Sequence, residues 1–132
     1  VLEISHAFTA MQLAKIIARK RGLDPFLSAL TGLFHDWARV LTGDNDNHAE
    51  RGYEPVKTLL LEEGLTPEQA EKIAIAVKNH SKKHEEGSPL EELIKDVDVF
   101  DSSLYGLIKD DPAYTSRLER VKQELGEDYG KK

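Results

Sequence analysis

Imidazole and carboxylate side chains recur in this sequence at positions where they could hold metal ions. Two of them, His35 and Asp36, are neighbours inside an apolar stretch. Burying a carboxylate in such surroundings costs several kcal/mol unless a partner neutralises it, and a metal ion would also account for the imidazole beside it. Other candidates of the same two kinds lie elsewhere in the chain: His6, His48, His80 and Asp98.

Taken singly, an inward histidine is more often a hydrogen-bonded core residue than a ligand. Together the candidates are harder to explain in that way, because several buried imidazoles and two buried carboxylates would each need a compensating partner. Metal ions satisfy them all in one place. The chain has no cysteine, so any ligands are nitrogen and oxygen atoms, which favours Fe, Mn, Mg, Co or Ni over structural zinc.

Helical spacing places these side chains on separate elements. A first helix is expected over residues 5–21, with Ser5 as its N-cap and His6 on its inward face. A second helix is expected over residues 25–41, where apolar residues recur at helical spacing, and it carries the adjacent His–Asp pair in its interior. Both elements would then aim candidate ligands at the core.

The middle of the chain contributes two more candidates. His48 stands at the entrance of a helix that ends at Gly64, and Pro55 is expected to kink or restart this helix because proline removes a backbone donor. The next helix is expected to begin at the capping residue Thr66 and to run to about His80, which closes an apolar stripe in the last turn.

The last third of the chain supplies the second candidate carboxylate. A helix that starts at the capping residue Ser88 places Asp98 on its inward edge. Asp96 is expected to face solvent, and Asp101, one turn beyond Asp98, is expected to support it. A final and mostly polar helix is expected over residues 112–125.

Length and composition indicate a small globular protein. The chain has 132 residues, of which 39% are hydrophobic and 32% are charged, and a single domain over residues 1–132 is expected. Five or six helices with short connections and no strand pattern predict an all-α bundle. The net charge of −6 argues against broad binding of nucleic acid. No apolar run approaches the ~20 residues of a membrane span, and the first residues do not resemble a signal peptide, so a cytoplasmic location is expected.

The order of the candidates resembles a known family signature. His6, then His35 with Asp36, then Asp98 looks like the His...His-Asp...Asp pattern of the HD-domain superfamily of metal-dependent phosphohydrolases. The resemblance covers about residues 5–106. Local sequences are similar to those of the superfamily over residues 32–36, 48–54, 78–81 and 96–101.

This resemblance implies an HD-type helical fold with a dinuclear metal site. In members with two middle histidines, here His48 and His80, these hold a second ion, and the aspartate of the pair bridges both ions. Many members have a lysine three residues after that aspartate, where this chain has Arg39. The forked guanidinium could still meet a phosphate. The implied ligands of the first ion are His6, His35, Asp36 and Asp98.

Such a site would hydrolyse a phosphoric ester or pyrophosphate bond in a small phosphorylated metabolite or a nucleotide. Water that bridges two divalent ions is acidified from a pKa of 15.7 toward ~7, which makes hydroxide available as the nucleophile. The predicted catalytic residues are Asp36 as the bridge, with Arg39 and Arg51 as partners of the phosphate charge. Further basic candidates, each more often a plain surface residue, are Lys78, Lys82 and Lys83.

Two other functions remain open. Some relatives with the same six ligands use a mixed-valent di-iron centre to activate oxygen and cleave a carbon bond, and the ligands alone do not separate the two reactions. Hydrolysis is favoured because it is commoner in the superfamily and because basic residues flank the site. The third interpretation is a non-catalytic domain in which metal ions only staple the helices together. The sequence does not indicate an oligomeric state.

Overall fold

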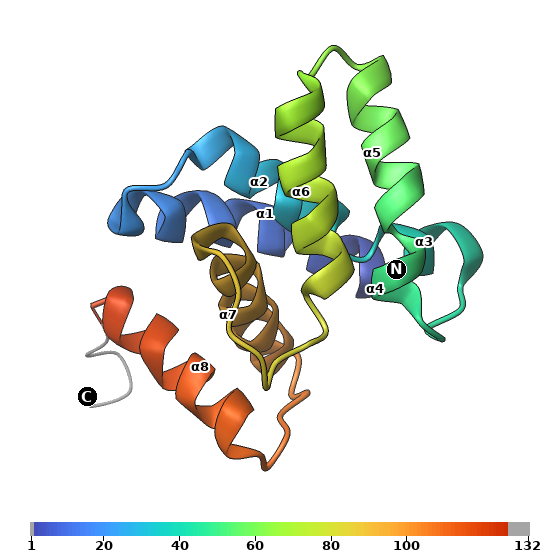
Figure 1. Ribbon diagram of the computed structural model, residues 1–132. Coiled ribbons are helices and arrows are strands. Elements are labelled where there is room, and N and C mark those ends of the chain that lie inside the picture. The colour runs from blue at the N-terminus through green and yellow to red at the C-terminus, as the bar shows by residue number, and fades with distance from the viewer. Residues whose placement is uncertain (1, 127–132) are drawn as a thin grey trace.

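The computed structural model describes residues 2–126, and all regular elements within them are helices (Figure 1). The all-α architecture predicted from the sequence is confirmed. None of the helices described combines the length and apolarity needed to cross a membrane. In chain order they are α1 Leu2–Arg21, α2 Pro25–Phe34, α3 Trp37–Thr42, α4 His48–Arg51, α5 Tyr53–Glu62, α6 Pro67–Asn79, α7 Pro89–Leu104 and α8 Pro112–Glu124.

A capping residue followed by proline starts α2, α6, α7 and α8. The side-chain oxygen of the capping residue accepts a hydrogen bond from a backbone N–H of the first turn, and proline at the first helical position gives up no intrahelical bond. At α6 and α7, Gln69 and Glu91 complete reciprocal capping boxes. These starts agree with the sequence signals. The capping residues are Asp24, Thr66, Ser88 and Asp111.

Two of the expected helical regions are interrupted. The region over residues 25–41 breaks at His35 and Asp36, which separates α2 from α3. The second interruption falls at Gly52, between α4 and α5, and not at Pro55. Proline is tolerated there because it stands in the first turn of α5, where its missing N–H would have no intrahelical partner. The two breaks turn six helical regions into eight helices among the described residues.

The start of the first helix also differs from the expectation. α1 begins at Leu2, so Ser5 lies inside the helix and is not its N-cap. The predicted end is correct, since Gly22 follows the helix with a φ of 71°, a left-handed conformation that favours glycine. His6 therefore lies in the second turn of α1, on a face that is buried.

α1 and α2 cross at a contact that only small side chains permit. A Cβ added to Gly32 would lie 2.7 Å from the backbone oxygen of Ala10, and Ala10 and Ala14 are fully buried. The close approach sets the spacing of two metal-ligand candidates, because His6 lies one turn before Ala10 and His35 follows Gly32 by nearly one turn. The sequence thus positions part of the site through small residues rather than through large ones.

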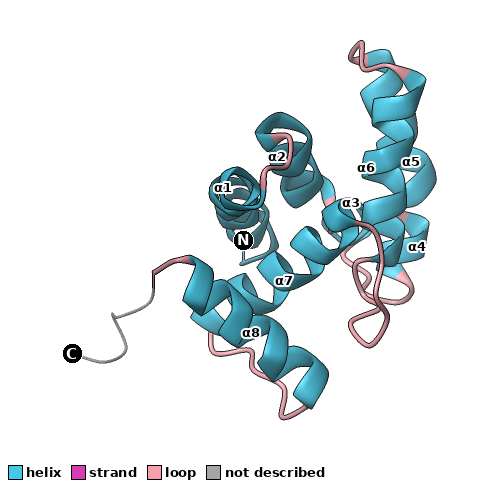
Figure 2. Cartoon of the chain, turned by 60° about the vertical axis from the view of Figure 1, so that its left-hand side comes forward, coloured by secondary structure: helices cyan, strands magenta, loops and turns pink. Residues whose placement is uncertain are grey.

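The buried apolar residues form two cores. Figure 2 shows α7 lying between α8 and the pair α1 and α2, which agrees with its packing contacts. One core joins α1, α7 and α8, and the other joins α5 and α6 with partly buried residues of α2. The buried members are Ala10, Ala14, Ile17, Ala18, Leu93, Val97, Phe100 and Val121 in the first core, and Val56, Leu60, Ala70, Ile73 and Val77 in the second.

The expectation that Asp96 faces solvent is wrong. Its side chain is fully buried, because α7 is covered by α1, α2, α6 and α8 and has no continuous solvent face in its middle turns. The carboxylate pairs with the guanidinium groups of Arg21, Arg117 and Arg120 at 2.7, 2.8 and 3.0 Å. We call these four residues the Asp96 hub.

Candidate metal centre

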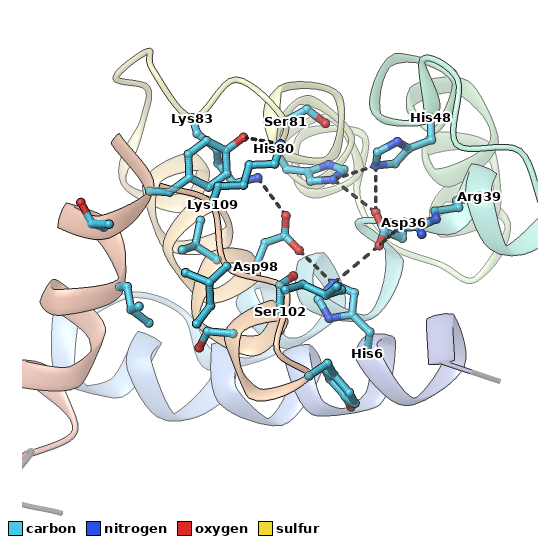
Figure 3. Close-up of a pocket in the computed structure, with 18 residues that line it drawn as sticks. His6, Asp36, Arg39, His48, His80, Ser81, Lys83, Asp98, Ser102 and Lys109 are labelled. Atoms are coloured by element: carbon cyan, nitrogen blue, oxygen red, sulfur yellow. Dashed lines mark hydrogen bonds and ion pairs between the residues drawn. The ribbon is translucent and has the colours of Figure 1, made fainter. Parts of the chain in front are cut away.

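The structure brings all the predicted metal ligands together. Figure 3 shows His6, Asp36, His48, His80 and Asp98 facing one another. They come from elements that are distant in the sequence, so the bundle as a whole is needed to form the site. Their places are His6 in α1, His35 and Asp36 in the break between α2 and α3, His48 at the start of α4, His80 at the C-cap of α6 and Asp98 in α7.

The break between α2 and α3 frees the central carboxylate. Asp36 has φ −105° and ψ 23°, outside the helical region, and its side chain makes no capping hydrogen bond to α3. The carboxylate is 4% exposed and turns into the cluster. A continuous helix would have left the two neighbouring residues 100° apart around the axis, whereas the break lets His35 and Asp36 face the same point.

The first group of potential ligands consists of His6, His35, Asp36 and Asp98. The Nε2 atoms of His6 and His35 lie 2.9 Å apart, and Asp98 Oδ1 lies 2.8 Å from the first and 3.2 Å from the second. Asp36 Oδ2 completes the group, at 3.6 Å from His6 Nε2 and 3.4 Å from His35 Nε2. All of these donor atoms lie within 4.8 Å of one another.

The second group consists of Asp36, His48 and His80. His48 Nε2 and His80 Nε2 lie 3.2 Å apart, and Asp36 Oδ1 lies 3.0 Å from the former and 3.3 Å from the latter. Asp36 thus faces the first group with one oxygen and the second with the other (Figure 3). This is the placement that a carboxylate bridging two ions requires.

The outer ring nitrogens of the four histidines are all occupied. Nδ1 of His35, His48 and His80 donates to the backbone oxygens of Gly32, Asn45 and Val77 at 2.7, 3.0 and 2.7 Å. His6 Nδ1 donates to Asp101 Oδ2 at 2.5 Å. A proton on each Nδ1 leaves each Nε2 with a lone pair that points inward, which is the usual arrangement behind metal-bound histidines.

The electrostatics of the site favour positive charge between the carboxylates. Burial lowers the pKa of His6, but hydrogen bonds to Asp101 and Asp98 outweigh it and raise that pKa to about 10. Burial would raise the pKa of Asp36, but without metal the charge of His35 and hydrogen bonds from His48 and His80 hold it well below its usual range. A proton on His6 and a metal ion would compete for the same lone pair, because ligands bind metals in their deprotonated form.

The donor set fits divalent metal ions. Imidazole lone pairs approach one another at 2.9 and 3.2 Å, a contact between two acceptors that is favourable only with a cation or proton between them. Nitrogen and carboxylate oxygen ligands without thiolate suit Mn, Fe, Co and Ni, and the share of imidazole favours these ions over Mg. The geometry thus accommodates one ion in each group, with Asp36 shared.

A cavity of about 550 Å³ opens beside the ligands. Five of them lie at one end, and residues of α3, the α6–α7 connector, α7, the α7–α8 loop and α8 line the remainder (Figure 3). Basic side chains on the cavity wall are Arg39, Lys83 and Lys109. The apolar and aromatic side chains that line it are Val99, Tyr105, Leu107, Ile108, Tyr114 and Leu118.

The predicted basic residues separate into two sets. Arg39 lines the cavity, with Nη1 3.9 Å from Asp36 Oδ2, whereas Arg51 is exposed and donates to the backbone oxygen of Asp44 at 2.9 Å. Lys78 and Lys82 do not line the cavity, and Lys83 does. Of the predicted basic residues, the structure therefore brings Arg39 and Lys83 to the ligands.

Sequence reasoning did not identify the full role of two residues. Asp101, expected to support Asp98, instead accepts from His6 and is 1% exposed. Lys83 is 6% exposed and contacts Asp98 Oδ2 at 2.8 Å, although it lies in a connector rich in charge. Spacing along α7 reveals that Asp101 shares a face with Asp98, but no local pattern indicates that a lysine in a charged connector is buried.

Comparisons with known proteins agree with this geometry. The sequence profile of the HD domain family matches residues 4–103, more than half of the chain. A solved structure from an uncultured Thermotogales bacterium, described as a predicted HD superfamily hydrolase, is similar in fold, with a TM-score of 0.66 and 23% identity, over 93% of this chain and 75% of that one. A search of curated protein sequences gave no match. This chain belongs to the HD domain family.

Proposed function

We propose that this protein is a metal-dependent phosphohydrolase that acts on a small phosphorylated metabolite or nucleotide. The observation that carries the proposal is the pair of ligand groups that share Asp36 at the end of a cavity with basic side chains. Membership of the HD domain family supports metal-dependent chemistry, and the similar fold of a predicted HD superfamily hydrolase supports hydrolysis.

Two divalent ions would be held by the six predicted ligands. When bound, the ions lower the pKa of a water molecule and draw charge from the phosphoryl oxygens. The protein's own contribution is rigidity, because backbone oxygens or Asp101 fix the orientation of each imidazole. Asp36 is 3% exposed and faces each ligand group with a different oxygen, so it can serve both ions.

Arg39 is the residue best placed among the predicted catalytic arginines to bind a phosphate. Its guanidinium lies beside Asp36 Oδ2 and lines the cavity, so it can donate two parallel hydrogen bonds to phosphoryl oxygens near the ligands. Arg51 would first have to leave the loop carbonyl of Asp44. We therefore assign phosphate binding to Arg39 and give Arg51 a role in holding the loop.

The shape of the cavity supports a small substrate with one end anionic and the other apolar. The ligating side chains and Arg39 lie near Asp36, whereas the side chains contributed by α7, α8 and the loop between them are mostly apolar or aromatic, with Lys109 over the ring of Tyr114. A volume of about 550 Å³ is within the range of pockets for small molecules. A nucleoside or another compact organic group would contact the apolar wall while its phosphate met the ligands.

The experiment is metal analysis followed by a phosphate-release screen. The purified protein is assayed for bound metals, stripped with a chelator, and reloaded separately with Mn, Co, Ni and Mg. It is then tested on phosphomonoesters, phosphodiesters, nucleotides and pyrophosphates. Phosphate or nucleotide release that depends on added metal supports the proposal.

Two other results would contradict the phosphohydrolase function and indicate a different one. Bound iron with oxygen consumption and no phosphate release would indicate the di-iron oxygenase reaction. Metal binding without turnover of either kind, in a protein that stays folded, would indicate a non-catalytic domain stapled by metal ions.

A further inference from the structure

Lys83 is a buried cation at the junction of the ligands and the cavity. It lies in the connector between α6 and α7, three residues after His80, and its side chain is 5% exposed. The residue nonetheless lines the cavity (Figure 3). Lysine is rarely buried without a specific partner, so this placement calls for a physical explanation.

The ammonium group has donors to spare. Its one hydrogen bond within the described residues goes to Asp98 Oδ2 at 2.8 Å, and the ring centre of Tyr114 lies 5.8 Å from Nζ. Three N–H donors are available to an ammonium group, so a single carboxylate oxygen leaves two of them without a partner among the described residues. The other oxygen of Asp98 faces His6 and His35, so Asp98 connects Lys83 to the first ligand group.

Arg117 of α8 holds the backbone that carries Lys83. Its Nε and Nη2 donate to the carbonyl oxygen of Lys83 at 3.1 and 2.9 Å, and Nη2 also donates to that of Glu85 at 3.2 Å. The remaining nitrogen, Nη1, donates to Asp96 Oδ1 at 2.8 Å and to Glu92 Oε1 at 3.1 Å. One buried guanidinium thus ties the connector to α7, which carries Asp98.

This contact comes from outside the part of the chain that defines the family. The family match ends at residue 103, and α8 begins at Pro112. α8 also lines the cavity through Tyr114, Thr115 and Leu118. The helix therefore contributes to the site in two ways, by lining its wall and by fixing the connector.

We propose that Lys83 binds a phosphoryl oxygen of the substrate beside the metal ions, and that Arg117 is the residue that positions it. The inference rests on the proposed phosphohydrolase function. Asp98 holds the ammonium group on one side, and its free N–H donors meet a non-bridging oxygen of the substrate on the other. The added positive charge matches the two negative charges of a phosphomonoester.

A purely structural role for Lys83 predicts a different effect of its substitution on metal binding and on phosphate binding. If Lys83 only orients Asp98, its loss should weaken metal binding and leave phosphate binding by the loaded protein unchanged. If it binds substrate, its loss should weaken phosphate binding even when both ions are present. Metal content and phosphate affinity, measured separately, therefore distinguish the two roles.

The test measures binding of inorganic phosphate to protein loaded with Mn²⁺, by isothermal titration calorimetry and by broadening of the ³¹P signal. Lys83→Met should weaken phosphate binding by about 10- to 100-fold, the range for one charged hydrogen bond, at full metal content. Lys83→Arg should recover part of the affinity, and Lys82→Met, next in the chain and outside the cavity, should match the wild type. Unchanged affinity in Lys83→Met would overturn the inference.

The wild type separates this inference from the proposed function. If the loaded wild-type protein neither binds phosphate nor releases it from any ester, the proposed function fails and the inference with it. If the wild type does both and Lys83→Met does both equally well, only the inference fails.

Positioning by Arg117 is tested with a double variant. Arg117→Lys keeps a positive charge near Asp96 but loses the fork to the Lys83 carbonyl, and it should weaken phosphate binding less than Lys83→Met does. Combined with Lys83→Met, it should cause no further loss of phosphate affinity, because its effect acts through Lys83. Its effect on thermal unfolding should be the same in both backgrounds. Additive losses of phosphate affinity would contradict the positioning role.

Discussion

Two carboxylates on α7, the fully buried Asp96 and the partly buried Asp98, lie only two residues apart and have different surroundings. Asp96 is fully buried and receives hydrogen bonds from the guanidinium groups of Arg21, Arg117 and Arg120. Asp98 turns to the other side of the helix, where its neighbours are the Nε2 atoms of His6 and His35 and the ammonium of Lys83. One helix thus carries two carboxylates, one neutralised by three guanidinium groups and the other surrounded by two imidazoles and one ammonium group.

The difference separates structure from function. In the Asp96 hub the protein supplies its own cations, and every close contact joins a donor to an acceptor, as a structural ion pair requires. Around Asp98 and Asp36 the protein supplies lone pairs that face one another, with their outer nitrogens already committed. The first arrangement ties α1, α7 and α8 together, and the second is suited to holding cations.

The largest effect should follow from removing the shared ligand. Asp36→Ala deprives both groups of an oxygen, so the protein should lose most of its metal, and phosphate release should fall by about 10³-fold or more, since bound metal supplies several kcal/mol of transition-state stabilisation. The rise in melting temperature on adding Mn²⁺ should disappear as well. Elemental analysis, a phosphate assay and thermal unfolding measure these effects.

The matched control for this variant is Asp46→Ala, on the exposed loop after α3. It should behave as the wild type in all three measurements. Metal content and activity that survive in Asp36→Ala would show that the two groups do not depend on a common bridge.

The Asp96 hub should give the opposite result. Asp96→Ala leaves three guanidinium groups without their common partner and should lower the free energy of unfolding by about 3–5 kcal/mol. Metal content per folded molecule should stay near that of the wild type. Denaturant unfolding and elemental analysis measure the two quantities. If Asp96→Ala does not fold, Asp96→Asn is a milder substitution for the same test. Loss of metal without loss of stability in either variant would contradict the structural role of Asp96.

A smaller loss of metal affinity is expected when Asp101, the hydrogen-bond partner of His6, is changed. Asp101→Asn keeps the shape of the side chain but removes the charge that orients the imidazole through Nδ1, and such changes weaken metal binding by about 10- to 100-fold. Competition with a fluorescent chelator measures the affinity. Stability of the metal-free protein should change little by comparison with Asp96→Ala, and an affinity equal to that of the wild type would exclude a supporting role for Asp101.

The smallest effect concerns acid stability at the edge of the hub. Burial raises the pKa of Glu92, but the backbone N–H of Gly87 and the guanidinium of Arg117 outweigh it, so the folded-state pKa lies below 4.5. A lowered pKa stabilises the fold above pH 4.5, and this contribution is lost as the pH falls below it. Glu92→Gln should therefore reduce stability slightly at pH 7 and flatten the loss between pH 5 and ~3. Urea unfolding of the wild type and of Glu92→Gln across this pH range measures the difference. Identical dependence of stability on pH in the two proteins would contradict the role of Glu92.

Much of the fold follows from local signals in the sequence. The starts of α2, α6 and α7 were predicted because a capping side chain and a proline act within one turn, and the start of α8 was predicted from Pro112 alone. The break at Asp36 was missed, since the apolar spacing continues through it and no capping hydrogen bond from its side chain marks it. The start of α1 was misplaced because a serine inside a helix looks like a cap in the sequence.

The sequence identified the candidate ligands that lie together in the structure, but not all of the residues that contact them. The type and the order of these residues in the sequence were enough to name all six candidates, which lie together in the structure. Asp96 was misplaced because a periodicity argument assumes one solvent face, while α7 is covered on several sides. The position of Lys83 depends on Arg117, which is 34 residues further along the chain. Contacts of that range leave no trace in local sequence patterns.

The most direct test is anomalous X-ray diffraction from crystals of the protein loaded with Mn²⁺. We expect two anomalous peaks, one surrounded by His6, His35, Asp36 and Asp98 and the other by Asp36, His48 and His80, with one oxygen of Asp36 toward each. A loaded crystal with no peak among these residues, or with peaks only at the protein surface, would contradict this expectation.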